Sequence, residues 1–307
     1  MANPLTSSQF QRLLDARLRE VADSSRYEEL SGMIPKLYTQ LSSDKAFEEF
    51  YNVGAMPDIP TFNGALTYLS MSPGYHNKIE PKEFAGGVMV ERKFTDDNQY
   101  GVLDNFASEL GRSMGRVEEK YGCRSFGYAF SSSFDFTTSE EGVALCSSSH
   151  TTKSGTSTAS GFDNSGTSAL SKTAVAATRI LMNGFRNDIS ERISLRPNVL
   201  LVPDNLADTA QEIIGSEKDP DSANNTMNPQ YRRFEVWVYP RLDDYDTNNW
   251  FMIDTNLMKK SLYWINRIGP EFNMTVDFET FMLKHSVYRR IGAGPIDWPF
   301  IYGHSVT

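Results

Sequence analysis

The sequence predicts an α+β fold. Three observations carry this prediction: long helical stripes of apolar residues, short apolar runs typical of strands, and an order of elements that does not repeat as βαβ units would. The 307 residues allow two or three compact units or one elongated unit. Aromatic residues form 12% and charged residues 22% of the chain, a composition typical of folded proteins and not of disordered ones.

The first expected element is an amphipathic helix close to the N-terminus. Apolar residues recur there at spacings of three and four, with charged residues between them. The stripe consists of Phe10, Leu13, Leu14, Leu18 and Val21. Such a helix needs a surface to pack against, which another part of the fold or a neighbouring subunit could supply.

A proline-punctuated segment follows, from residue 56 to residue 94. Two strand-like runs, at 65–69 and 87–94, flank a turn-like sequence at 72–78. This pattern predicts a long β-hairpin or extended loop. Because it carries few large apolar groups, we expect it to lie away from the centre of a core.

The strongest helical signal predicts a helix over residues 97–121, about 36 Å long at about 1.5 Å per residue. Gly122 occupies the position of a C′ glycine. Gly101, Gly111 and Gly115 each weaken a helix by about 1 kcal/mol relative to alanine, so we expect another backbone to approach closely there. The apolar stripe is Leu103, Phe106, Leu110, Met114, Val117 and Tyr121.

Residues 147–171 are biased in composition, because Ser, Thr and Gly fill 17 of the 25 positions. This segment predicts an exposed loop that tolerates deletion. A helix is expected at 173–185, and a second one after Asp204 or Asn205. Strands are expected at 198–203, 233–240, 250–253, 262–265, 278–283 and 286–291.

No catalytic or metal-binding motif is found. The net charge of −9 argues against a protein whose whole surface grips nucleic acid, and two cysteines are too few for a disulfide scaffold or a Cys-built zinc site. The isolated histidines His76, His150, His285 and His304 form no ligand pattern. We therefore expect no cofactor, no metal and no enzymatic activity. The one enzymatic alternative is a hydrolase that uses Ser149 or a serine of the 147–171 segment with His150 or His285.

The N-terminus has no basic region followed by an apolar stretch, so we expect no secretory signal. No run of about 18 apolar residues predicts a membrane span. We therefore expect a protein of a reducing cytoplasm that contacts no membrane.

Five stretches, in this order, resemble tailed-bacteriophage major capsid proteins of the Hong Kong 97 fold, of the Mu-like major head subunit type. The similar stretches are 82–93 (KEFAGGVMVERK), 96–101 (DDNQYG), 145–150 (LCSSSH), 197–203 (PNVLLVP) and 249–251 (NWF). The resemblance covers the chain from about residue 38 to the end.

The resemblance implies how the chain is divided. Residues 1–56 would form an N-terminal arm and residues 57–94 the extended E-loop hairpin. Residues 95–145 would form the peripheral domain with its long spine helix, and residues 146–240 mainly the axial domain with its Ser/Thr/Gly-rich loop. Residues 241–307 would supply C-terminal strands to both domains.

The resemblance also implies a function: self-assembly into hexamers and pentamers of an icosahedral shell that encloses phage double-stranded DNA. The partners would be the chain itself, a portal, a separate scaffold and decoration proteins, with DNA on the inner face bound without sequence specificity. The location would be the virion, assembled in the host cytoplasm. An encapsulin-like compartment shell is the structural alternative. The expected assembly interface comprises Leu66, Tyr68, Leu69, Tyr75, Lys78, Gly111 and Gly115.

Overall fold

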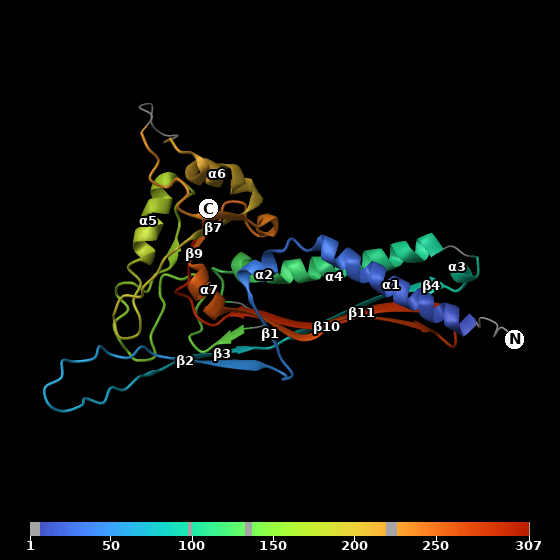
Figure 1. Cartoon of the computed structure of the whole chain (residues 1–307), viewed down its shortest axis with the longest axis horizontal. Helices are drawn as coiled ribbons and strands as arrows, with labels where there is room; N and C mark the ends of the chain where they lie inside the picture. Colours follow the sequence, from blue (N-terminus) through green and yellow to red (C-terminus); the bar gives the residue numbers. More distant parts are fainter. Residues whose placement is uncertain (1–6, 98–99, 133–136, 219–225, 307) are drawn as a thin grey trace.

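The computed structural model describes residues 7–97, 100–132, 137–218 and 226–306, with side chains described from residue 16 onward except at 95, 96, 137 and 138. The side chains of Phe10, Leu13 and Leu14 therefore lie outside the described part. Figure 1 shows a long arm, built of extended strands and two long helices, joined at one end to a second body. Helices and sheets occur side by side without βαβ repetition, which confirms the predicted α+β class.

The arm contains a four-stranded sheet. Two of its strands form a long antiparallel hairpin, a third strand pairs antiparallel with that hairpin, and a fourth pairs parallel with it. The order across the sheet is β1 (Thr39–Ser42), β10 (Leu262–Val276), β11 (Met282–Pro295) and β4 (Lys82–Glu91). Because β10 and β11 extend far beyond β1, this hairpin gives the arm its length.

Two helices, α1 (Ser7–Glu29) and α4 (Tyr100–Gly127), lie along one side of this sheet (Figure 1). They cross where α4 carries glycines. A Cβ atom at Gly111 would overlap with the carbonyl oxygen of Ala22, and one at Gly115 would lie 2.7 Å from the carbonyl oxygen of Arg26. The expected close backbone approach is therefore real, and α1 makes it.

A buried charge cluster joins α1, α4 and the sheet. Glu118 of α4 accepts two hydrogen bonds from the Arg26 guanidinium of α1, at 2.9 and 3.0 Å, and forms an ion pair with Arg289 of β11. All three residues are at most 6% exposed. Two guanidinium groups share the one Glu118 carboxylate, and burial lowers the pKa of Arg289, so the ion pairs offset only part of the desolvation cost.

The adjacent Glu119 joins α4 to the second body. Its carboxylate accepts from the Ser31 amide at 2.8 Å and from the Tyr239 hydroxyl at 3.0 Å. Burial, together with this carboxylate, raises the pKa of Tyr239. The hydroxyl therefore stays protonated and remains a donor.

The second body surrounds a five-stranded sheet that carries the largest part of the core. Its central strands, β9 (Trp250–Ile253) and β7 (Val199–Val202), are buried along their whole length. The order is β6 (Ser165–Gly166), β12 (Ile301–His304), β9, β7 and β8 (Glu235–Val238). The helices of this body are α5 (Lys172–Met182) and α6 (Ala207–Gly215).

A three-stranded sheet lies where the arm meets the second body (Figure 1). Its strands are β2 (Glu48–Val53), β3 (Pro73–Ile79) and β5 (Thr137–Ser139), in that order. Short helices complete the fold: α2 (Met33–Leu37), α3 (Lys93–Asp96), α7 (Thr255–Ser261), η1 (Asp204–Leu206) and η2 (Pro240–Asp244).

The expected hairpin between 65–69 and 87–94 is wrong in its strands. Residues 65–69 are not a strand, and β4 pairs with β11 of the arm sheet. The hairpin that forms is β2 with β3, because the alternating residues of β2 pair with the turn-like sequence at 73–79. The strand expected at 278–283 is wrong over most of its length: residues 278–280 form the turn between β10 and β11, and only 282–283 belong to β11.

Two details of the long helix differ from expectation. Gly122 does not end α4, which continues to Gly127; instead Gly122 packs on Ile34, and its carbonyl accepts from the Tyr38 hydroxyl. Phe106 is 38% exposed, so the buried face of α4 is rotated away from part of the predicted stripe. The cause is tertiary, because α1 covers the glycine side of the helix.

The glycine crossing gives a first prediction. We expect Gly111→Ala to lower the free energy of unfolding by about 1–3 kcal/mol, because the added methyl group forces α1 away from α4. Gly101→Ala is the matched control in the same helix: no described atom lies within 4 Å of its added Cβ, so we expect no loss. Urea unfolding of both variants measures the difference. Equal stability of both would contradict the packing argument.

Candidate assembly interface

A projecting loop, residues 54–72, joins β2 to β3 without regular secondary structure. The amide of Gly54 donates to the carbonyl oxygen of Ser72 at 2.8 Å and closes the base of the loop. Figure 1 shows the loop extending beyond the rest of the molecule at the lower left. It is therefore placed to reach a neighbouring molecule.

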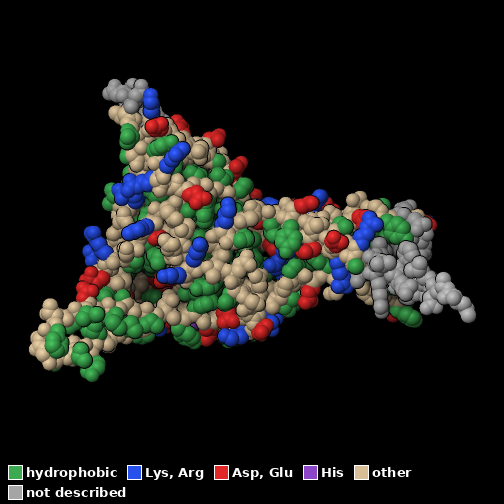
Figure 2. Space-filling model, in the orientation of Figure 1, with side chains coloured by type: hydrophobic (Ala, Val, Ile, Leu, Met, Phe, Trp, Pro, Cys, Tyr) green, Lys and Arg blue, Asp and Glu red, His purple; other side chains and the backbone are tan. Residues whose placement is uncertain are grey.

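The projecting loop exposes large apolar side chains, which Figure 2 shows as a green extension at the lower left. The exposed fractions are 52% for Met56, 85% for Ile59, 75% for Phe62, 78% for Leu66, 93% for Tyr68 and 49% for Met71. Asp58 is the one charged residue in the loop. A contiguous apolar surface of this kind is typical of a site that another protein covers.

Three residues predicted for the interface lie in this loop. Leu66 and Tyr68 are exposed, whereas Leu69 is half-buried. Sequence reasoning missed Ile59 and Phe62, which lie on either side of Pro60 and show no helical or strand periodicity. What could have indicated these two residues is their apolar character in a segment that cannot bury them within the chain.

Two further predicted residues contact their own chain. The Tyr75 hydroxyl shares a hydrogen bond with the Thr151 hydroxyl at 2.8 Å. The Lys78 ammonium lies 4.1 Å from the centroid of the Phe47 ring and 3.4 Å from the Glu80 carboxylate. Both side chains therefore hold the base of the hairpin in place.

Gly111 and Gly115 were expected at the interface, and this expectation is wrong. Both are buried beneath α1 of the same chain. The sequence signalled that a backbone approaches them, but it could not show whose backbone.

Asp188 of the second body holds the base of the projecting loop. Its carboxylate accepts from the Ala55 amide at 2.8 Å, and a side chain at Gly54 would overlap with its other oxygen. The Asp188 carbonyl oxygen accepts from the Ser154 hydroxyl at 2.9 Å and from the Thr156 hydroxyl at 2.5 Å. The direction of the loop therefore depends on a chain of contacts that begins in the 147–171 segment.

The 147–171 segment is consequently more than the exposed loop that its composition suggested. Phe162 and Asn164 are at most 4% exposed. The Asn164 amide group donates to the carbonyl oxygens of Leu145 and Ile301, at 2.8 and 3.2 Å. Hydrogen bonds of Asn164 and the burial of Phe162 together attach the segment to the core, which composition alone does not reveal.

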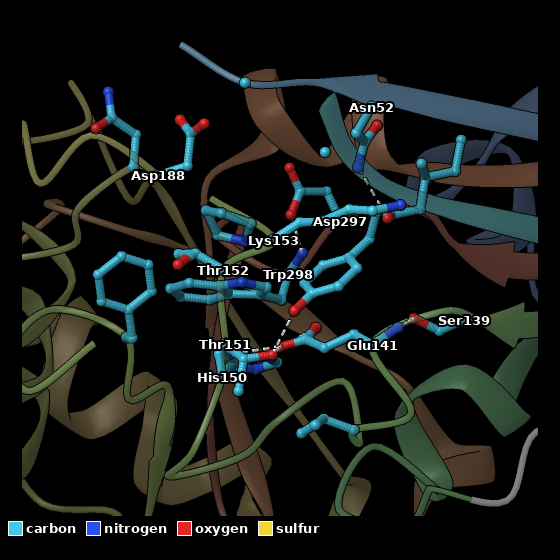
Figure 3. Close-up of a pocket in the computed structure, with 18 of the residues that line it drawn as sticks. Asn52, Ser139, Glu141, His150, Thr151, Thr152, Lys153, Asp188, Asp297 and Trp298 are labelled. Carbon is cyan, nitrogen blue, oxygen red and sulfur yellow. Dashed lines mark hydrogen bonds and ion pairs between the residues drawn. The ribbon is translucent and has the colours of Figure 1, made fainter. Parts of the chain in front are cut away.

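A cavity of about 330 Å³ lies behind the hairpin base. Figure 3 shows Asp188, Lys153, Asp297 and Trp298 around it, with Glu141 and His150 on the opposite side of the Trp298 ring. Asn77, which is 4% exposed, donates to the Ile296 carbonyl oxygen, while its own carbonyl oxygen has no described partner. The cavity thus separates the hairpin from the second body.

Asp297 lines this cavity, where its side chain is exposed, although many protein atoms surround its carboxyl group. Desolvation by the surrounding protein raises the pKa of Asp297 to about 6, although its carboxylate accepts from the Trp298 amide at 2.8 Å. The carboxyl group is therefore part-protonated slightly below neutral pH.

The hydrolase residues are not brought together. The His150 ring stacks on the Trp298 ring, with 4.4 Å between the ring centroids. Its two ring nitrogens contact the Glu141 carboxylate at 3.2 Å and the Asn164 side-chain oxygen at 3.1 Å. Among the described contacts, none links this ring to Ser149. His285 lies on β11 in the arm sheet.

Within the described residues, no group of three or more His, Cys, Asp or Glu side chains could hold a metal ion. No helix in the described part of the chain is long and apolar enough to cross a membrane. His304 is a hydrogen-bonded core imidazole: it contacts the Thr178 hydroxyl at 2.8 Å, and burial lowers its pKa to about 4.

A second exposed apolar group lies at the opposite end of the molecule, around the turn between β10 and β11. Phe278 is 91% exposed, Phe281 58% and Val276 41%. Phe281 has a positive φ of 53°, which is unfavourable for a bulky residue. Apolar contact groups therefore occur at both ends of the elongated chain.

In a comparison with protein families, the model described as phage capsid protein matches residues 77–303. No curated protein sequence matches the chain. Neither result tests the Mu-like subtype, which stays a prediction.

Solved structures of low sequence identity share the fold. The capsid of bacteriophage JBD30 matches with a TM-score of 0.55 at 16% identity, covering 69% of this chain and 91% of that one. The capsid of the cyanophage P-SCSP1u matches with a TM-score of 0.56 at 11% identity, covering 89% and 87%. The capsid of a native GTA particle matches with a TM-score of 0.52 at 11% identity, covering 100% and 93%.

Removing the Asp188 carboxylate tests how the loop base is held. In Asp188→Ala the Ala55 amide loses a charged acceptor, a bond that contributes about 1.5–3 kcal/mol. We expect hydrogen exchange at the Ala55 amide to become at least about tenfold faster, as mass spectrometry can measure. Asp58→Ala, which removes the same charge within the projecting loop, is the control. Unchanged exchange in Asp188→Ala would show that other contacts hold the loop.

Asp297 predicts a pH dependence. Its pKa is raised from 3.8 to about 6, so between these values the folded state binds more protons than the unfolded chain. This group's contribution to the free energy of unfolding therefore falls as pH rises from about 4 to about 6. We expect Asp297→Asn to gain stability relative to the parent chain between about pH 4 and about pH 7 in urea unfolding.

Asp277→Asn is the control of opposite sign, because the Lys284 ammonium lowers the pKa of Asp277. That carboxylate stabilises the folded state above its unfolded pKa, so its removal should cost more at the higher pH. A flat difference for Asp297→Asn would contradict the raised pKa.

Proposed function

The chain belongs to the phage capsid protein family, and from this premise we propose that it is a major capsid subunit that builds the hexamers and pentamers of one icosahedral shell around double-stranded DNA. The observation that carries the assembly mechanism is the projecting loop, which exposes apolar groups that its own chain does not cover. The role is structural.

The proposed contact is heterologous: the projecting loop of one subunit lies on a different surface of its neighbour. Repeating such a contact closes rings and shells when the rotation closes. The second apolar group at the β10–β11 turn supports a further contact at the other end of the subunit. We propose that β2, the projecting loop and β3 together form the E-loop, and that the arm and the second body are the peripheral and axial domains.

We also propose the partners and location of the shell. Besides other copies of the chain, these are a portal, a separate scaffold, and decoration proteins on the outside. Support for the last comes from a neighbour described as a JBD30 capsid decorated with minor capsid protein trimers. The protein would be a virion component, assembled in the host cytoplasm.

The family match favours this function over a compartment shell or a hydrolase. The fold is shared with a virus-like particle from Pyrococcus furiosus, at a TM-score of 0.50 and 10% identity. The content of purified shells, DNA or enzyme, distinguishes a phage capsid from a cellular compartment.

Polar substitution in the projecting loop tests the mechanism. We expect the triple variant Phe62→Ser, Leu66→Ser, Tyr68→Ser to fold normally but to form no shells. Burying three such side chains contributes about 5 kcal/mol per contact, which is more than a thousandfold in association. Negative-stain microscopy and sedimentation velocity report the shells, and urea unfolding reports the fold. Residues 73–79 stay intact because β3 carries the buried Ile79.

The control keeps the three side chains apolar: Phe62→Leu, Leu66→Met, Tyr68→Phe. This variant should form shells like the parent chain, because apolar area is largely retained. Normal shells from the triple serine variant would refute the placement of the interface in the projecting loop.

A further inference from the structure

Four exposed cations surround α7: Lys36, Arg196, Lys259 and Lys260, here called the α7 cationic surface. None of them forms an ion pair with a described acidic side chain, whereas many cations elsewhere do, such as Lys45 with Glu48 and Lys284 with Asp277. Unpaired cations on a chain of net charge −9 form a local surface of the opposite sign.

Hydrogen bonds and packing bring these residues together from three parts of the sequence. The Arg196 amide donates to the Asp254 carboxylate at 2.7 Å, directly before α7. The Thr39 hydroxyl donates to the Lys259 carbonyl oxygen at 2.6 Å, and α2, which carries Lys36, packs against α7. Figure 2 shows Lys and Arg side chains over the second body.

Asp254, the acid directly before α7, does not cancel the charge of Lys259 and Lys260. It is 2% exposed and serves as the N-cap of α7, accepting from the amides of Asn256 and Leu257. The Asp254 carboxylate therefore bonds to backbone amides of its own chain. Lys259 and Lys260 lie at the other end of the helix. Glu191 and Glu235, by contrast, are exposed near Arg196.

The surface also lacks what a protein partner would need. None of the described residues at 33–37, 191–198 or 254–261 is a large exposed hydrophobic, whereas the cores of protein–protein interfaces are apolar. Exposed lysine and arginine side chains on neighbouring segments, without an apolar centre, instead suit contact with the phosphates of a nucleic acid duplex.

We propose that the α7 cationic surface contacts the phosphate backbone of the packaged DNA duplex and that this face of the subunit lines the inside of the shell. The inference rests on the proposed capsid function. Contact is independent of base sequence, because ammonium and guanidinium groups here would bind phosphate oxygens. The net negative charge of the chain weakens the overall attraction for DNA, so the packaged duplex remains releasable.

The test is binding of a fluorescein-labelled duplex of about 20 base pairs to the purified full chain, followed by anisotropy at several salt concentrations. Four phosphate contacts predict a slope of about −3.6 in log K against log salt, about a hundredfold loss of affinity between 50 and 200 mM. The variant Lys36→Gln, Arg196→Gln, Lys259→Gln, Lys260→Gln should lose this binding and its salt dependence, while still forming shells.

The matched control removes four charges elsewhere: Arg17→Gln, Lys45→Gln, Arg112→Gln and Lys284→Gln. These side chains are 58%, 74%, 44% and 41% exposed, and each pairs with an acid. The control should bind the duplex like the parent chain. Absence of duplex binding by the parent chain, or equal loss in both variants, would overturn the proposal.

Shell formation separates this proposal from the proposed function. If the parent chain forms no shells, the capsid function fails, whatever the duplex binding shows. If the α7 variant binds the duplex normally but fails to form shells, the surface is a contact between copies of the chain and the DNA proposal is overturned.

Discussion

The structure depends on two adjacent buried glutamates in the C-terminal half of the long helix α4. Glu118 holds Arg26 of α1 and Arg289 of β11, and Glu119 holds Ser31 and Tyr239. Removing one member of a buried charge cluster leaves uncompensated charge and costs about 3–5 kcal/mol. Glu118 and Glu119 therefore attach the N-terminal helix, the arm sheet and the second body to α4. These attachments make the arm stiff.

Because the arm is stiff, the exposed apolar groups of the projecting loop keep a defined position. The projecting loop has no core of its own, but its base is fixed by Asp188, by the Gly54–Ser72 hydrogen bond and by the packing of β3. A loop that is anchored at its base and apolar along its length can be presented to a neighbour in a defined direction. A capsid subunit needs this property, because many copies must make the same contact.

The candidate interface was only partly predictable. Leu66 and Tyr68 could be selected because an apolar residue in a proline-rich segment has no helix or strand face to bury it. Gly111 signalled a close backbone approach correctly, but it was assigned to a second subunit when α1 makes the contact. Asp188 carried no signal at all, since a lone aspartate in a turn resembles any solvated residue until the Ala55 amide is placed beside it.

The sequence alone determined the α+β class, the long helix, the buried strand at 199–202 and the likeness to a capsid family, because these follow from periodicity and from the order of segments along the chain. Only the tertiary structure decided that β4 belongs to the arm sheet, that β2 pairs with β3, and that the 147–171 segment positions the projecting loop. These features depend on contacts between residues far apart in sequence. Local propensity favours a strand or a turn, but it does not choose the partner.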